Sequence, residues 1–229
     1  MLEKFIKDTY ENSLTAAVFS HLLHLPRERL WEILRNACYT ENLPHDPGEP
    51  KLITWPGWNP DGTDNSQRVV PDLFLRFPHF DLIIEAKRGD NDMQNPDQWK
   101  KELTAYDNEY GKYKREVRLL ALGGIHSEND VLLPHQPFDC PVHMCRWRRV
   151  LLECQRLKTD LEKTNKSNSS SQTFAYVRVL DDLIAFFAAF GFPALRWFLD
   201  FVFAPNLLDD FVDFDQQYFQ SVSLQFQRL

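Results

Sequence analysis

Two short apolar segments joined by a Pro-His turn constrain the fold of this chain more than any other feature. The first segment runs from 69 to 75 and the second from 81 to 84, with Pro78 and His79 between them. β-Branched and aromatic residues cluster within each segment and turn residues bound them, a pattern typical of β-strands. We therefore predict a β-hairpin at this point of the chain.

The turn also predicts which residues of the hairpin face each other. A two-residue loop, or a four-residue loop on the same centre, pairs Asp72 with Glu85. The wider loop is favoured, because Pro78 does not adopt the positive φ of a type I′ turn. Side chains alternate along a strand, so Glu85 and Lys87 share one face. The sequence thus predicts two carboxylates and one ammonium group on a single patch.

Two directly opposed carboxylates repel each other unless a cation lies between them. Oxygen ligands of this kind suit Mg²⁺ or Mn²⁺, whereas Zn²⁺ more often takes His or Cys. Lys87 could then steady a phosphate group or a water molecule beside the metal ion. The hairpin therefore predicts a metal site for phosphate chemistry.

At these residues the chain resembles the PD-(D/E)xK nuclease superfamily, whose signature reads here as Pro71-Asp72 followed by Glu85-Ala86-Lys87. The resemblance covers roughly residues 5 to 125. It implies an α/β fold with a restriction-endonuclease-like core, in which a central mixed β-sheet is flanked by helices. It also implies that Asp72 and Glu85 bind Mg²⁺, with Mn²⁺ as a substitute. The carbonyl group of Ala86 would be a further metal ligand, and Lys87 would be the catalytic lysine.

Two predicted helices carry further candidates that the resemblance suggests. Glu11 begins a helix predicted over about 12–25, where superfamily members often place another metal ligand. The alternative is a carboxylate stabilised by the positive end of that helix. Gln98 opens a second predicted helix, and several subgroups carry a Gln near the substrate on this helix. The alternative is a Gln exposed on the surface.

A formal net charge of −7 is unfavourable for a protein that binds nucleic acid, because phosphate contacts normally require positive charge. Basic residues nevertheless follow the motif, and Lys100 and Lys101 are candidates for DNA contact or for a solvated helix face. Trp55 and Trp58 precede the motif in a loop rich in Pro, Gly, Asn and Asp. They either stack on bases or cover an edge of the core.

The chain divides into a nuclease-like core over 1–145 and a mostly helical C-terminal extension over 146–229, packed together as one structural domain. The extension contains a basic helix, a polar loop over 164–172 and a helix that stops near Gly191. Its apolar helices cover the sheet or pair with a second copy, which suggests a homo-oligomer. The apolar run over 194–203 is interrupted too early for a membrane span, and alternation over 222–226 predicts a strand.

The start of the sequence has no apolar run of the kind found in secretion signals, so we expect a cytoplasmic protein. We expect a Mg²⁺-dependent nuclease that acts on DNA rather than RNA, in restriction, phage defence or DNA repair. The alternative is a catalytically inactive protein of the same fold that serves as a nucleic-acid or protein interaction module. If Asp72 and Glu85 do not lie together, the chain is an unrelated α/β domain.

Overall fold

The computed structural model describes residues 11–54, 56–89, 93–167 and 170–192. These residues belong to a compact unit that ends at residue 193, and residues 194–229 form a second unit. The apolar run over 194–203 and the strand over 222–226 therefore lie outside the described residues.

The unit is built on a six-stranded mixed sheet with the strand order β1-β2-β3-β4-β6-β5. β1 and β2 pair antiparallel, as do β2 and β3, whereas β3, β4 and β6 run parallel to one another and β5 is antiparallel to β6. The predicted α/β class with a mixed sheet is confirmed. The strands are β1 (Lys51–Thr54), β2 (Leu73–Arg76), β3 (Phe80–Ala86), β4 (Glu116–Leu122), β5 (Val131–Leu133) and β6 (Cys140–Cys145).

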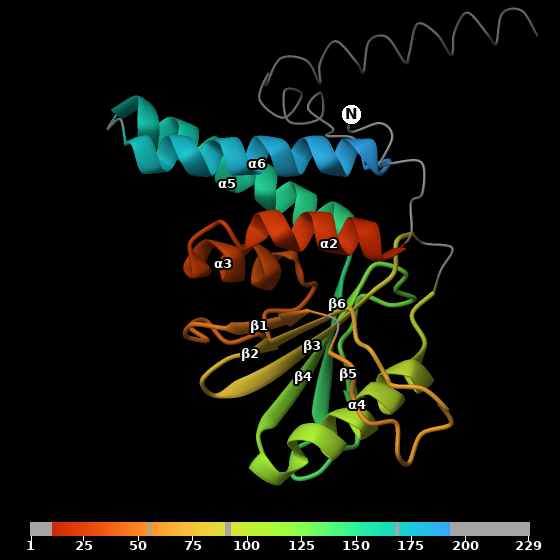
Figure 1. The fold of residues 1–229 in the computed structure, drawn as a ribbon. Coiled ribbons are helices and arrows are strands. Elements are labelled where there is room, and N and C mark those ends of the chain that lie inside the picture. Colours follow the sequence, from red (N-terminus) through yellow and green to blue (C-terminus); the bar gives the residue numbers. More distant parts are fainter. Residues whose placement is uncertain (1–10, 55, 90–92, 168–169, 193–229) are drawn as a thin grey trace, which may run out of the picture. The chain divides into compact units, whose positions relative to one another are not determined.

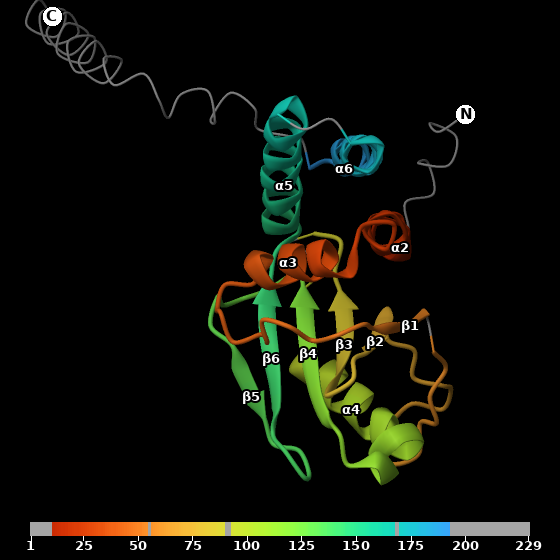
Figure 2. The same ribbon diagram turned by 90° about the vertical axis from the view of Figure 1, so that its left-hand side faces the viewer.

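Helices flank the sheet on both sides, as predicted. α2 and α3 lie on one side and α4 on the other, while α5 and α6 form a further layer beyond α2 and α3 (Figure 1). Figure 2 shows α4 behind the sheet and α5 continuing from the end of β6. The helices are α2 (Glu11–Leu22), α3 (Arg27–Ala37), α4 (Pro96–Tyr110), α5 (Trp147–Ser167) and α6 (Ser171–Ala189), and a 3₁₀ turn, η1 (Gly111–Tyr113), follows α4.

The sheet separates two apolar clusters, and β3 contributes to both because all of its residues are buried. Leu82 and Ile84 face the cluster formed with α2, α3, α5 and α6. Ile83 faces the cluster formed with α4. A central strand covered on both faces reads as a continuous apolar run, as β3 and β4 do.

The hairpin has the predicted register. Leu73 pairs with Ile84 and Arg76 pairs with Asp81, and the Phe77 N–H donates to the Phe80 carbonyl group at 2.9 Å, so the turn centres on Pro78 and His79. Asp72 directly precedes β2, at the position where the same register continues to Glu85. Side-chain alternation then puts Asp72, Asp81 and Glu85 on the α4 side of the sheet.

Parts of the helical structure differ from the prediction. The segment 164–172 was expected to be a loop, but α5 continues to Ser167 and α6 begins at Ser171. Polar residues extend α5 beyond its last buried contact, supported by ion pairs such as that between Lys158 and Glu162 at 3.3 Å. α5 and α6 share one apolar cluster with α2 and α3, through residues such as Trp147 and Leu180.

Candidate active site

Asp72 and Glu85 meet at the C-terminal end of β3, on the side of the sheet that α4 covers. Both side chains are buried. The backbone N–H of Ala86 donates a hydrogen bond to Asp72 Oδ2 at 2.8 Å, which fixes the Asp72 carboxylate against β3. The Lys87 N–H bonds to Leu122 of β4, so the amide and carbonyl groups of Ala86 face the opposite neighbour, where Asp72 lies.

Lys87 belongs to the same patch. Its ammonium group lies 2.8 Å from Glu85 Oε1, and its side chain is 21 % exposed. The structure therefore brings Asp72, Glu85 and Lys87 together, two carboxylates in a buried position and one cation that reaches solvent.

A third carboxylate, Glu102 of α4, completes the site and was not predicted from the sequence. Glu102 is fully buried, and its Oε1 accepts a hydrogen bond from the Gln98 amide at 3.0 Å. Its Oε2 is buried with no hydrogen-bond partner. Burial, followed by the negative charge of Glu85 and a side-chain hydrogen bond between the two glutamates, raises the pKa of Glu102 well above its usual value, so Glu102 can share a proton with Glu85.

The helical period contained a signal for Glu102. Trp99, Leu103 and Tyr106 form the buried stripe of α4, and Glu102 lies within it, three residues after Trp99 and four before Tyr106. Gln98 precedes Glu102 by one helical turn and orients its carboxylate. Gln98 is thus a supporting residue of the site in this structure, half-buried rather than fully exposed.

Gln94 fixes the end of β3 to the start of α4. Its side-chain nitrogen donates to the carbonyl groups of Glu85 at 2.9 Å and Gly123 at 3.2 Å. Its side-chain oxygen accepts from the Trp99 indole at 2.9 Å. Because all of these groups are buried, the bonds hold the Glu85 backbone and the first turn of α4 in one geometry.

The backbone of Lys87 is held from the other side. The Trp147 indole donates to the Lys87 carbonyl group at 2.8 Å. Gly123 has φ +75°, and a Cβ atom at that position would lie 2.2 Å from the same carbonyl oxygen. A glycine is therefore required where β4 turns past the end of β3.

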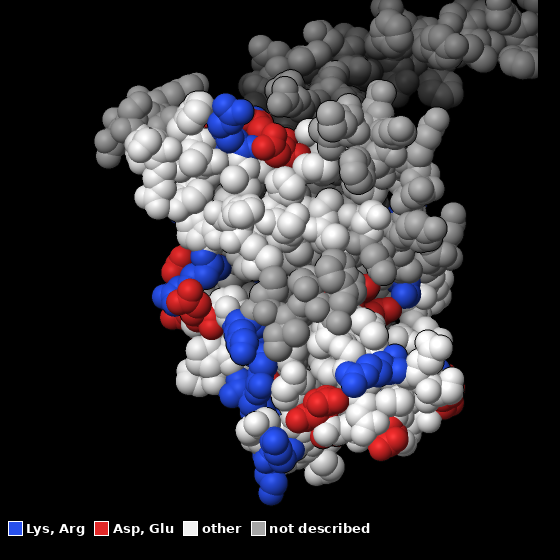
Figure 3. All heavy atoms as spheres, viewed as in Figure 1, with Lys and Arg blue, Asp and Glu red and all other residues white. Residues whose placement is uncertain are grey.

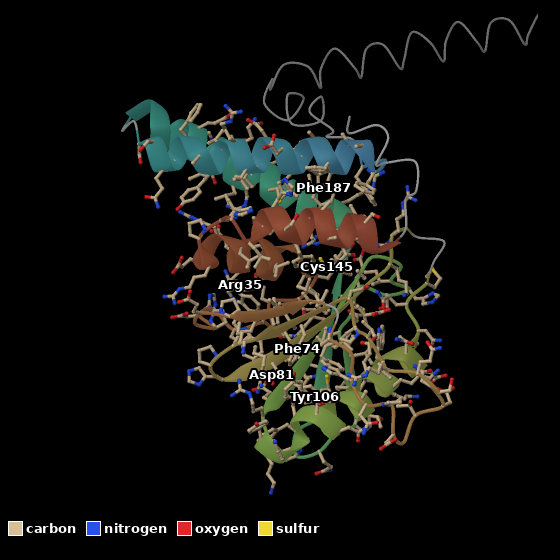
Figure 4. All side chains as sticks on the ribbon, in the orientation of Figure 1. Arg35, Phe74, Asp81, Tyr106, Cys145 and Phe187 are labelled. Carbon is tan, nitrogen blue, oxygen red and sulfur yellow. The ribbon has the colours of Figure 1, made fainter. Side chains whose placement is uncertain are left out.

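The opposite end of β3 carries another buried carboxylate, with very different surroundings. Asp81 Oδ1 lies 3.3 Å from Arg76 Nε and 3.1 Å from Arg115 Nε, and Asp81 Oδ2 accepts from the Tyr106 hydroxyl at 2.9 Å. Figure 4 shows Asp81 and Tyr106 close together between the sheet and α4. Burial and the Asp81 charge raise the pKa of Tyr106, so this hydroxyl remains a donor.

Among the described residues, those predicted to contact nucleic acid have partners within the protein. Lys100 pairs with Asp97 at 3.0 Å and Lys101 pairs with Asp64 at 2.8 Å, so a neighbouring carboxylate balances each charge. Trp58 is 2 % exposed and packs edge-on against Phe74, at 5.2 Å between ring centroids. Of the two alternatives for Trp58, the structure supports the second, because its ring is part of the core and is not available to stack on bases.

Two other predicted residues fall at the limits of the described chain. Trp55 lies outside the described residues. Glu11 begins α2, as expected for a residue at a helix start, but the structure describes nothing of its side chain. The proposed role of Glu11 as a metal ligand therefore stays a prediction.

The donor set of the site fits a hard divalent cation. Within the described ranges, no three Asp, Glu, His or Cys side chains are already arranged as a metal cage. Lys87 neutralises Glu85 instead, and Ala86 N–H holds one oxygen of Asp72. Glu102 Oε2 has neither compensation, and carboxylate oxygens are what Mg²⁺ and Mn²⁺ prefer. Rotation of Lys87 away from Glu85 would free the second carboxylate for the same ion.

Asp130 shows that an unpartnered oxygen alone does not define such a site. Asp130 Oδ1 also lacks a partner, but its Oδ2 lies within 3.1 Å of donors on Thr40, Asn42 and His143. Hydrogen bonds from these groups lower the pKa of Asp130 despite its burial. At Glu102 the neighbours are carboxylates, and either a proton shared with Glu85 or a bound cation would offset their repulsion.

Comparisons of the chain with protein-family models, curated proteins and solved structures give no match. None of the helices in the described part of the chain is long and apolar enough to cross a membrane.

Proposed function

We propose that this chain is a Mg²⁺-dependent nuclease that hydrolyses phosphodiester bonds in DNA. The observation that carries the proposal is the buried group of three carboxylates, in which Glu102 lies against Asp72 and Glu85 and no donor group of another residue reaches its Oε2. Grouping like charges away from water is costly unless a cation joins them. A lysine beside such a cation suits the chemistry of a phosphate diester.

Each residue has a distinct role in this proposal. Asp72, Glu85 and Glu102 would hold the cation, and the Ala86 carbonyl group faces the same side. A bound Mg²⁺ supplies Lewis acidity and lowers the pKa of coordinated water. Gln98 orients Glu102 through its amide.

In this proposal Lys87 acts on the substrate. Its ammonium group is held by Glu85 at 2.8 Å, and its partial exposure gives it access to a bound phosphate. An ammonium group that donates to a non-bridging phosphate oxygen stabilises the negative charge that grows in the transition state. The hydrogen bond from the Trp147 indole to the Lys87 carbonyl group holds the Lys87 backbone in place, so that only the end of the side chain needs to move.

The choice of DNA over RNA, and a role in restriction, phage defence or DNA repair, rest on resemblance to the PD-(D/E)xK superfamily, which is an analogy of fold. The carboxylates and the lysine support phosphodiester hydrolysis, but they do not distinguish DNA from RNA. An inactive protein of the same fold, acting as an interaction module, is the alternative that the following experiment separates.

The test is cleavage of supercoiled plasmid by the full chain in Mg²⁺, Mn²⁺ or EDTA. Lys87→Ala and Glu102→Gln are compared with Lys100→Ala, which removes an exposed lysine of the same region. We expect metal-dependent nicking by the wild type and by Lys100→Ala. Lys87→Ala should lose about 10²–10³-fold in rate, the usual effect of removing a charge-stabilising group.

Equal cleavage by wild type and Lys87→Ala would show that the activity arises elsewhere, and the proposed site would be abandoned. Folded wild-type protein that cleaves neither plasmid nor single-stranded circular DNA would favour the interaction module. Circular dichroism of each variant separates loss of the site from loss of the fold.

A further inference from the structure

A cationic surface with an exposed tyrosine lies at the opposite end of the sheet from the carboxylates. Lys51 of β1 pairs with Arg76 of β2, so the two side chains share a face. The turn after α4 adds Lys112, Lys114 and the ring of Tyr113. Figure 3 shows blue side chains in a column that runs from β1 and β2 to the C-terminal end of α4. We call Lys51, Arg76, Lys112, Tyr113, Lys114 and Arg115 the tyrosine platform.

The platform has excess positive charge in a chain whose formal net charge is −7. Asp81 is buried and compensates Arg76 and Arg115 together, so one of these two charges is unbalanced. Lys51 and Lys112 form no ion pair with any residue that the structure describes, and neither does Lys114. These residues therefore differ from Lys100 and Lys101, which neighbouring carboxylates neutralise.

Tyr113 provides a flat apolar surface within this charge. It is 55 % exposed, one of the most exposed large apolar side chains among the described residues. Arg76 lies 5.6 Å and Lys112 lies 5.0 Å from its ring centroid. Both distances are within the range of a cation–π interaction, which limits the motion of the ring.

The backbone conformation of the turn after α4 also helps to keep Tyr113 at the surface. Lys114 has φ 50°, an uncommon left-handed conformation for a residue other than glycine. This turn reverses the chain after Tyr113 and returns Arg115 to Asp81. Buried Asp81 thereby anchors the platform while Tyr113 stays at the surface.

We propose that the tyrosine platform binds single-stranded nucleic acid, with one base stacked on Tyr113 and phosphates on the surrounding lysines. A positively charged surface with an aromatic ring is the usual arrangement for strands bound without sequence preference. The proposal rests on the proposed nuclease function in that it specifies the substrate as one with a single-stranded stretch. Asp81 and Glu85 are four residue steps apart along β3, so the platform begins about 13 Å from Glu85.

The test measures binding of the full chain to a fluorescently labelled oligothymidylate of roughly 16 nucleotides by fluorescence anisotropy. EDTA is present so that no cleavage occurs. Tyr113→Ala should weaken binding at least about fivefold, the lower range for loss of one stacked base, whereas Tyr113→Phe should bind like the wild type. Lys112→Gln combined with Lys114→Asn should weaken binding and reduce the salt dependence, by about 0.7 in log–log slope for each lysine. Asn tolerates the left-handed conformation at 114.

Lys100→Gln is the matched control and should leave binding unchanged. Unchanged binding by Tyr113→Ala, or a loss in Tyr113→Phe equal to that in Tyr113→Ala, would overturn the proposal. Preference of the wild type for a duplex of the same length would also overturn it. If binding depends on Tyr113 but the protein shows no metal-dependent cleavage, the proposed binding role of the tyrosine platform is supported and the proposed nuclease function is contradicted. If cleavage is lost in Lys87→Ala but unaffected in Tyr113→Ala, the nuclease function is supported and the role of the platform in substrate binding is contradicted.

Discussion

The two ends of β3 place carboxylates in equally buried positions but give them opposite surroundings. Asp81, at one end, is contacted by two guanidinium groups and a tyrosine hydroxyl. At the other end, Glu85 and Glu102 share one lysine and one amide, and Glu102 Oε2 has no donor. Both groups lie on the same face of the sheet under the same helix, so burial alone does not explain the difference.

The comparison separates a structural carboxylate from a functional one. Asp81 is satisfied by groups that the fold itself supplies, and it ties β2, β3, β4 and α4 together. At the Glu102 end the carboxylates oppose one another, and a shared proton or a bound cation is needed to join them. A buried group whose partner is absent from the chain points to a ligand, whereas a fully partnered one points to stability.

The largest effect on stability is expected at the satisfied end. Asp81→Ala leaves Arg76 and Arg115 without their shared carboxylate and should lower the free energy of unfolding by about 3 kcal/mol, the cost of breaking a buried pair. Urea denaturation measures the change. Asp97→Ala, which breaks the exposed pair with Lys100, is the control and should change stability by about 0.5 kcal/mol or less. Similar costs for both variants would remove the structural role assigned to Asp81.

The second prediction concerns the incomplete end and has the opposite sign. In EDTA, Glu102→Gln should stabilise the protein by about 1–2 kcal/mol, because it removes an acid whose ionised form is disfavoured by burial and by two neighbouring carboxylates. The Gln side chain keeps the shape of Glu and can still bond to Gln98. Thermal unfolding measures the shift, with Glu128→Gln as an exposed control. Destabilisation by Glu102→Gln without metal would mean that the carboxylate is structural.

The smallest effect comes from the network around Asp130, a half-buried carboxylate that extends the comparison. His143 lies 2.8 Å from Asp130, and burial lowers the pKa of His143 below its usual value. The unfolded chain therefore takes up more protons than the folded one as the pH falls below about 6.5, and stability declines with falling pH. We expect a loss of about 1 kcal/mol between pH 7 and pH 5.5 in urea denaturation. A weaker dependence of stability on pH in His143→Gln would assign the loss to His143. An unchanged dependence would refute this assignment.

The local pattern of the sequence predicted the hairpin well. Alternation and the Pro-His turn determine the register, so the meeting of Asp72 with Glu85 followed from neighbours in the sequence. Lys87 followed from the same period of two. These predictions rest on interactions between strands that are joined by a short loop, where little else can intervene.

Glu102 and Trp58 show where local reasoning failed. Glu102 follows two lysines and reads as a solvated helix residue until α4 is placed on the sheet with Trp99 and Tyr106 facing inward. Trp58 reads as a loop residue, but its short bridge to Val69 carries it into the aromatic cluster under α4. Both positions depend on contacts between distant segments, which a single sequence does not display.

The sequence predicted positive charge after the motif without showing which lysines remain unpaired. Lys100 and Lys101 have carboxylates nearby in space, from Asp97 and Asp64. Lys112 and Lys114, which lie in and directly after η1, have none among the described residues. Ion pairing is decided by the tertiary fold, so the tyrosine platform became visible in the structure alone.

Calorimetric titration of Mn²⁺ into the metal-free full chain tests the central claim most directly, because it needs neither a substrate nor activity. The account predicts saturable binding to the wild type that is weakened at least about tenfold in Glu102→Gln. Asp97→Ala, which alters a carboxylate on the exposed side of α4, should bind Mn²⁺ as the wild type does. Equal binding by wild type and Glu102→Gln, or no binding by the folded wild type, would contradict a metal centre at the end of β3.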